Sequence, residues 1–111
     1  MIKRHKIGTN KGKRRIWLEG SAVKDAGFIG GSQYLLTPDA TRGVLHLHVL
    51  KPEHNTSRLA DDQQIRKVTG RPDGKPIIDI IGATIADTFP PTVTHVAVMF
   101  DAGRIIITPT N

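Results

Sequence analysis

The sequence GSAVKD at residues 20–25 has a counterpart in GATIAD at residues 82–87, and this pair of segments decides how the whole chain is interpreted. Outward from it, further features recur in the same order about 61 positions apart. They are HKI at 5–7 with RKV at 66–68, Gly12-Lys13 with Gly74-Lys75, Ile16 with Ile78, Phe28 with Phe89, YLL at 34–36 with VAV at 96–98, Asp39 with Asp101, and VLH at 44–46 with III at 105–107. Similarity at one period indicates a tandem duplication.

Each half predicts the same succession of elements. A strand leads through a Gly-rich basic turn into a second strand, a short helix and a closing pair of strands. The expected strands cover 3–7, 15–19, 33–37 and 44–50 in the first half, and 66–69, 77–81, 94–100 and 104–108 in the second; the helices cover 21–26 and 83–88. Ser21 is the expected N-cap of the first helix and Gly27 its stop.

The two halves are expected to share one core. A unit of about 45 residues is too small to bury its apolar face alone, whereas two units paired about a pseudo-twofold axis bury it together. We therefore predict one mainly β domain over residues 1–111, built from repeats 3–50 and 66–109. The polar linker 51–65 crosses the outside and carries one helical turn over 58–64. In the strand 44–50, alternation places Leu45 and Leu47 on one face and His46 and His48 on the other.

Composition narrows the class of protein. The chain has 111 residues, 38% hydrophobic and 23% charged, which is typical of a globular domain. It has no cysteine, which excludes disulfides, thiolate metal sites and cysteine nucleophiles and suits a reducing compartment. No apolar run is long enough to span a membrane and no secretory signal is recognisable, so we expect a cytoplasmic protein without membrane contact.

The positive charge is concentrated in segments. Residues 1–15 carry +7 and residues 51–76 carry +2, while the two other stretches are weakly acidic, for a total of +6. A basic turn present in both halves points to a polyanionic partner. The candidate nucleic-acid-binding residues are Lys3, Arg4, Lys6, Lys11, Lys13, Arg14, Arg15, Arg66, Lys67, Arg71 and Lys75.

One stretch resembles a known family. The segment IWLEG at 16–20, followed by DAGFIGGSQY at 25–34, is similar to the G-x-x-L-x-x-A-G-F-x-x-G signature of SymE-like and SpoVT/AbrB-like swapped-hairpin proteins. Val23 takes the Leu position and Gly31 the final Gly, while the second half departs from the pattern at Thr88 and Pro90-Pro91. The resemblance implies a duplicated AbrB-like swapped-hairpin β-barrel with two short helices. It also implies DNA binding through basic residues near the first strands, in a transcriptional regulator or antitoxin-like factor.

The chemistry of the basic side chains divides their expected roles. Arg14, Arg15 and Arg71 are the candidates for base edges, because a guanidinium pairs with guanine through two hydrogen bonds. The lysines of the turns are expected to contact phosphates. Trp17 is expected in the core, which disfavours recognition of single strands by base stacking. RNA stays open as a ligand beside double-stranded DNA.

No enzyme is predicted. GTNKGK at 8–13 lacks the spacing and the Ser/Thr of a phosphate-binding loop, and no nucleophile has a base near it in sequence. His46, His48 and His54 have no carboxylate to complete a metal site, so we expect neither metal nor cofactor. Two alternative functions remain: a phage-type adaptor or inhibitor of an acidic protein or nucleoprotein, and a SymE-like toxin acting on RNA. The duplication allows a complete monomer, and an unpaired edge strand would be the route to a homodimer.

Overall fold

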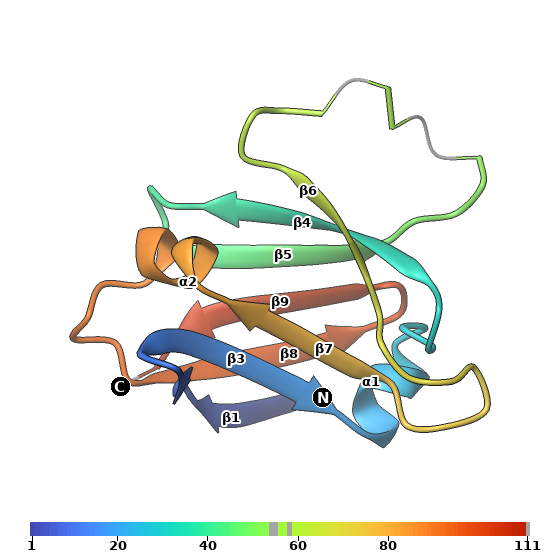
Figure 1. Cartoon of the computed structure of the whole chain (residues 1–111), viewed down its shortest axis with the longest axis horizontal. Coiled ribbons are helices and arrows are strands. Elements are labelled where there is room, and N and C mark those ends of the chain that lie inside the picture. Colours follow the sequence, from blue (N-terminus) through green and yellow to red (C-terminus); the bar gives the residue numbers. More distant parts are fainter. Residues whose placement is uncertain (54–55, 58, 111) are drawn as a thin grey trace.

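The computed structural model describes residues 1–53, 56–57 and 59–110. Its elements are β1 (Ile2–Lys6), β2 (Gly8–Asn10), β3 (Lys13–Glu19), α1 (Ser21–Asp25), β4 (Gln33–Asp39), β5 (Val44–Val49), β6 (Gln64–Lys67), β7 (Ile77–Ile81), α2 (Ala83–Thr88), β8 (His95–Asp101) and β9 (Arg104–Pro109). All strand pairs are antiparallel. A six-stranded sheet and a three-stranded sheet lie against each other, with α1 and α2 on either side of the smaller one (Figure 1). Among the described residues, no helix is long and apolar enough to cross a membrane.

The strand order interleaves the two halves of the chain. The larger sheet runs β1-β8-β9-β5-β4-β6, and the smaller runs β2-β3-β7. Strand β1 therefore pairs with β8 of the second half, and β6 pairs with β4 of the first half. The counterparts in the two halves are β1 and β6, β4 and β8, and β5 and β9. Exchanging each strand of the larger sheet for its counterpart gives the same order, read from the opposite edge. Central pairs β5–β9 and β3–β7 also join one strand from each half.

Two bends carry the chain from one sheet to the other. Ile7 N–H donates to Thr94 O at 2.8 Å, and the next residues, β2, pair with β3. Val68 N–H donates to Ser32 O at 2.8 Å, and the following Thr69 exchanges hydrogen bonds with Ile77 at the start of β7. Because the ladders of the larger sheet stop at these bends, the result is two stacked sheets with corners formed by strands that change sheet.

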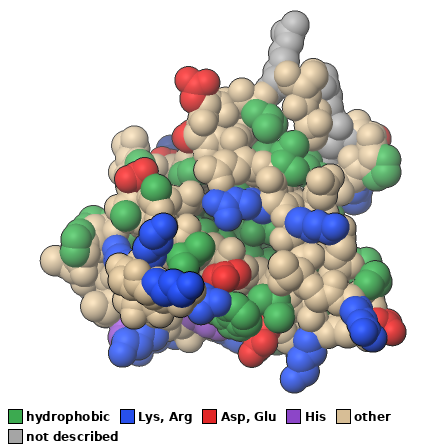
Figure 2. Space-filling view, viewed as in Figure 1, with side chains coloured by type: hydrophobic (Ala, Val, Ile, Leu, Met, Phe, Trp, Pro, Cys, Tyr) green, Lys and Arg blue, Asp and Glu red, His purple; other side chains and the backbone are tan. Residues whose placement is uncertain are grey.

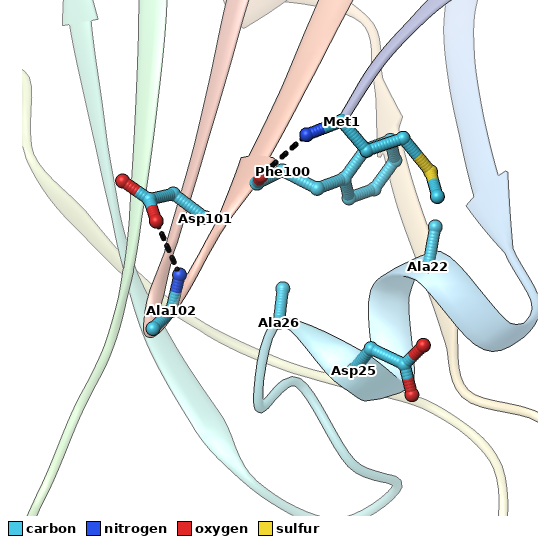
Figure 3. Close-up of a pocket in the computed structure, with 7 residues that line it drawn as sticks. All are labelled: Met1, Ala22, Asp25, Ala26, Phe100, Asp101 and Ala102. Atoms are coloured by element: carbon cyan, nitrogen blue, oxygen red, sulfur yellow. Dashed lines mark hydrogen bonds between the residues drawn. The ribbon is translucent and has the colours of Figure 1, made fainter.

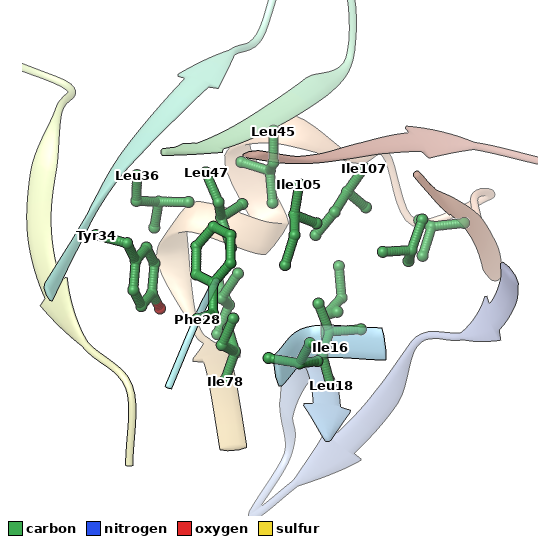
Figure 4. Packing of buried hydrophobic residues seen from close by; sticks show 14 of the residues in the cluster. Ile16, Leu18, Phe28, Tyr34, Leu36, Leu45, Leu47, Ile78, Ile105 and Ile107 are labelled. Atoms are coloured by element: carbon green, nitrogen blue, oxygen red, sulfur yellow. The ribbon is translucent and has the colours of Figure 1, made fainter. Parts of the chain in front are cut away.

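The core lies between the sheets and draws equally on both halves (Figure 4). The smaller sheet contributes Ile16, Leu18, Ile78 and Ile80, all at most 1% exposed, because alternate residues of β3 and β7 face inward. The larger sheet contributes Leu36, Leu45, Leu47, Val96, Val98, Ile105 and Ile107. Phe28 and Phe89 follow the two helices and are fully buried, and the Phe28 ring packs edge-on to Tyr34. Burial raises the pKa of the Tyr34 phenol to about 12.

Most of the expected elements are present. The mainly β class with two short helices is confirmed, the strand at 77–81 and the helix at 83–88 have the expected bounds, and Leu45 and Leu47 are buried while His46 and His48 face out. Gly27 has φ 96° directly after the first helix, as a stop requires.

Four expectations differ from the structure. The described strands close no barrel. Ser21 is not the N-cap: Gly20 is, with φ 99° and no side-chain cap. The linker forms a tight turn in place of a helical one, because Gln63 N–H donates to Ala60 O before β6 begins; Arg58 lies outside the described residues.

The fourth difference concerns the last strand of each half. The sequence alignment sets Leu45 beside Ile106, but Leu45 and Leu47 match Ile105 and Ile107 in burial. The turn between β8 and β9 is shorter by two residues than the turn between β4 and β5. The sequence alignment allows for a gap of only one residue here, so its pairing of β5 residues with β9 residues is wrong by one position. Since facing alternates along a strand, a shift of one exchanges the buried and exposed sets.

Candidate nucleic-acid interface

We define the first arm as β1 with the turn after β2, and it holds five exposed cations. The turn consists of Lys11 and Gly12 at φ 52° and 78°, between the paired residues Asn10 and Lys13. Positive φ at both central residues is the geometry of a tight two-residue hairpin, in which Gly12 is favourable and Lys11 unusual. The exposed cations of this arm are Lys3, Arg4, Lys6, Lys11 and Lys13.

We define the second arm as β6 with the turn over 70–76. Gly70 has φ 101° and lies against Gly30: a Cβ on Gly30 would come within 2.5 Å of the carbonyl oxygens of Gly70 and Arg71. Only glycine allows this close backbone approach, which fixes the turn against the loop after α1. Lys67, Arg71 and Lys75 are exposed in this arm, Arg66 is half-buried with its Nε donating to Gln64 Oε1 at 2.8 Å, and Asp73 opposes them.

The turns of the two arms lie at opposite ends of the smaller sheet. Strands β3 and β7 are antiparallel, so the turn before Lys13 and the turn before Ile77 point to opposite ends. Figure 2, viewed from the side of β3 and β7, shows Lys and Arg side chains on both sides of a central acidic side chain. The cations thus form two separated groups and no single continuous patch.

Arg14 is engaged inside the protein. Its guanidinium donates to the carbonyl oxygens of Phe89, Pro90 and Val93, which follow α2. These carbonyls belong to the loop that leaves α2, and a guanidinium, with five N–H donors, can bind several of them together. The role of a base-edge contact that the sequence suggested for Arg14 therefore competes with three internal hydrogen bonds.

Arg15 is engaged as well. Its Nε and Nη2 donate to the two carboxylate oxygens of Asp79 at 2.9 and 3.0 Å, and its guanidinium carbon lies 4.3 Å from the centre of the Trp17 ring. The hydrogen bonds that Arg15 donates to Asp79 raise the pKa of Arg15 above its ordinary value. Of the three arginines assigned to base edges, Arg71 alone has an exposed side chain with no interaction described within the protein.

Trp17 is not in the core, contrary to the expectation from sequence. Its side chain is 40% exposed and lies on the outer face of the smaller sheet. The signal was present in the alternation of β3: Ile16 and Leu18 face inward, so Trp17 between them must face out. The average tendency of tryptophan to be buried does not hold here, because the periodicity of the strand directs the side chain outward.

The cations of β1 face different ways. Lys3 and His5 pair with the buried Val98 and Val96 and share their inward side, at the edge of the sheet, while Arg4 and Lys6 share the outer side with Ala97 and His95. Burial, followed by the charge of Lys3, lowers the pKa of His5, whose Nε2 is buried without a hydrogen-bond partner.

Two hollows lie at corresponding places beside the helices. One of about 240 Å³ is lined by Met1, Ala22, Asp25, Ala26, Phe100, Asp101 and Ala102 (Figure 3). The other, of about 200 Å³, lies beside α2, and its lining includes Pro38, Ala40, Thr84, Asp87 and Thr88 at the positions that match Phe100, Ala102, Ala22, Asp25 and Ala26.

Each hollow is lined by two carboxylates, Asp25 and Asp101 in the first and Asp62 and Asp87 in the second. Asp101 accepts a hydrogen bond from Ala102 N–H at 2.9 Å and another from Arg104, and these, in that order, lower its pKa. Within residues 1–53, 56–57 and 59–110, no three His, Asp or Glu side chains are grouped as metal ligands. His46 and His48 have ring centres 6.4 Å apart, and His54 lies outside the described residues.

Comparison of the chain with protein-family models, with curated proteins and with solved structures finds no match. The resemblance to SymE-like and AbrB-like proteins therefore stays a prediction that rests on the quoted residues.

Proposed function

We propose that the chain binds double-stranded DNA through its two arms and acts as a transcriptional regulator or antitoxin-like factor. One observation gives the proposal its main support: exchanging the halves leaves the strand order of the larger sheet the same when it is read from the other edge, which favours equivalent places for the two basic turns. A ligand with repeating negative charge, such as a duplex, matches two equivalent cationic sites better than a single small anion does.

The finer proposal for the fold is a tandem duplication with exchanged hairpins. Trp17 pairs with Asp79, and each is the counterpart of the other, so a pseudo-twofold axis between them would relate β3 to β7. The matching bends at Ile7 and Val68 and the matching hollows support the same relation.

The spacing of the turns suits a duplex. The first turn ends at Lys13, and the second ends at Ile77, which pairs with Glu19 at the other end of β3. The separation of the turns is therefore about the length of β3, roughly 20 Å at 3.3 Å per residue. Two cationic turns at that separation can contact phosphates on either side of a groove, while the centre of the face lies over the bases. The first turn, with Lys11 and Lys13 and no acidic residue within it, is expected to contribute more affinity than the second, where Asp73 opposes Arg71 and Lys75.

The test is a fluorescence-anisotropy titration of labelled duplex DNA at two salt concentrations, with unlabelled duplex and RNA as competitors. We expect saturable binding that weakens by orders of magnitude as salt rises and that duplex competes better than RNA. Absence of binding at low salt overturns the proposal, and preferential competition by RNA replaces it with an RNA-binding function.

Charge-reversal variants locate the contact. Lys11→Glu with Lys13→Glu should abolish binding, and Arg71→Glu with Lys75→Glu should weaken it. Lys24→Glu with Arg42→Glu, which reverses two exposed cations outside both arms, is the control with the same change in net charge. Equal losses in all three variants would show that only net charge matters, which contradicts specific arms.

A further inference from the structure

Trp17 is placed where the fold does not need it. It lies at the middle of β3, opposite Asp79 of β7, and presents a 40% exposed ring to solvent. Its neighbours Ile16 and Leu18 fill the core on the other side of the strand. An exposed tryptophan at the centre of an outer face, with no packing role in the core, marks a contact surface.

The indole ring is held in place from one side. Arg15 lies over it with the guanidinium carbon 4.3 Å from the ring centre, and Arg15 is itself fixed by both oxygens of Asp79. A ring that is already ordered loses little conformational entropy when a ligand stacks on it. Arg15, Trp17 and Asp79 thus form a preorganised platform.

The platform lies between the two turns. Trp17 is at the central register of the β3–β7 pair, with the Lys11–Lys13 turn beyond one end and the Arg71–Lys75 turn beyond the other. Arg15 and Asp79 neutralise each other at this centre, so phosphate is attracted to the cationic ends and not to the middle. Along a nucleic acid held at both ends, the part opposite Trp17 is therefore a base.

We propose that Trp17 stacks on a nucleobase that has left the helical stack, so that the preferred ligand is duplex DNA with an unpaired base between the two phosphate contacts. The proposal rests on the proposed DNA binding and adds to it the kind of site that is bound. In a continuous duplex both faces of every base are covered by neighbours, so a base must be unpaired to be available at low cost. Stacking on an aromatic side chain tolerates any base, because every base has a π face.

The experiment compares three duplexes of equal length: one fully paired, one with a single unpaired adenine at its centre, and one with an abasic nucleotide at that place. Trp17 is the only tryptophan, so its fluorescence reports on stacking directly. We expect quenching and about tenfold tighter binding with the unpaired adenine alone. The abasic duplex matches its charge and flexibility and should bind like the paired one.

Two variants separate the platform from the arms. Trp17→Ala should lose the preference for the unpaired adenine but keep the salt dependence of binding to paired duplex, and Trp17→Phe should keep part of the preference. Urea unfolding of both variants checks that the fold is intact. If paired and adenine-bulged duplexes bind equally without quenching, the inference is wrong while the proposed function stands. If neither binds at low salt, the proposed function itself has failed.

Discussion

Strands β3 and β7 pair along the middle of the smaller sheet and can be compared residue by residue. Inward they are interchangeable: Ile16 and Leu18 on one strand match Ile78 and Ile80 on the other, and all four are buried. Outward they differ. Strand β3 presents Lys13, Arg15, Trp17 and Glu19, whereas β7 presents Ile77, Asp79 and Ile81.

This difference separates two demands on the same backbone. The inner face must fill a shared core, where volume and apolar character are tightly constrained. The outer face bears no such constraint, so it can carry different chemistry in each half. The two strands thus contribute alike to the core and differ in the side chains of their outer faces.

The largest effects are expected in the shared core. Leu18→Ala and Ile80→Ala, at matching buried positions, should each lower the free energy of unfolding by about 3 to 4 kcal/mol through lost burial and a residual cavity. Urea denaturation measures both. Because the core is common, each variant should unfold in a single transition. Two separate transitions, or a loss below about 1 kcal/mol in one variant, would show that the halves are not equivalent in packing.

The next test concerns how the second arm is fixed. Gly30→Ala should cost roughly 2 to 3 kcal/mol, since its Cβ would lie 2.5 Å from two backbone carbonyl oxygens of the 70–76 turn. Gly8→Ala in the first arm is the matched control, because the nearest atom to its Cβ is Arg15 O at 3.9 Å. Thermal unfolding of the two variants should separate them clearly. Equal melting temperatures would mean that the close approach at Gly30 is unimportant.

The first residues of β3 and the residues just before β7 differ at the position of Arg14. In the first half Arg14 binds three carbonyls, whereas the matching position before β7 is the buried Pro76. Arg14→Ala should cost about 2 kcal/mol, because it leaves partly buried carbonyls without donors. Lys13→Ala, an exposed neighbour, should change stability by less than about 0.5 kcal/mol. A similar small effect for both substitutions would contradict a structural role for Arg14.

The smallest effect is expected from His5, whose counterpart is Arg66. Burial lowers the pKa of His5 in the folded state, so the unfolded chain takes up the proton first as pH falls. Stability is therefore retained above the unfolded pKa of about 6.5 and declines as pH falls through and below it. Urea unfolding at about pH 7.5 and pH 5.5 should show this decline in the unmodified protein and a smaller one in His5→Gln. An unchanged decline in the variant would assign the effect to other groups.

Much of the fold could be predicted from local pattern. Alternation identified the buried and exposed sides of β5, and the ordered recurrence of Gly, Asp and Phe placed two helices and most strands. Pairing between strands far apart in sequence was not encoded locally. The two-residue difference between the β4–β5 and β8–β9 turns shifted the alignment of the last strands, which only the registers corrected.

The candidate interface was predictable in composition and less so in geometry. Charge counting found all the cations, but it could not show that Arg14 and Arg15 are held by internal acceptors, because those acceptors, Phe89 O and Asp79 among them, lie in the other half. Trp17 could have been placed correctly, since the periodicity of β3 outweighs the average burial of tryptophan.

The exchange of first strands between the halves has a consequence for how the molecule is assembled. Because β1 pairs only with β8 and β6 only with β4, each half has an outer strand whose one partner lies in the other half. During synthesis, β1 therefore stays unpaired until β8 has been made. Cleavage in the linker would leave two fragments that recognise each other by strand pairing, as the pieces of a split protein do. Between molecules, the same pairing would link one copy to the next, so the yield of swapped oligomers on refolding should rise with protein concentration.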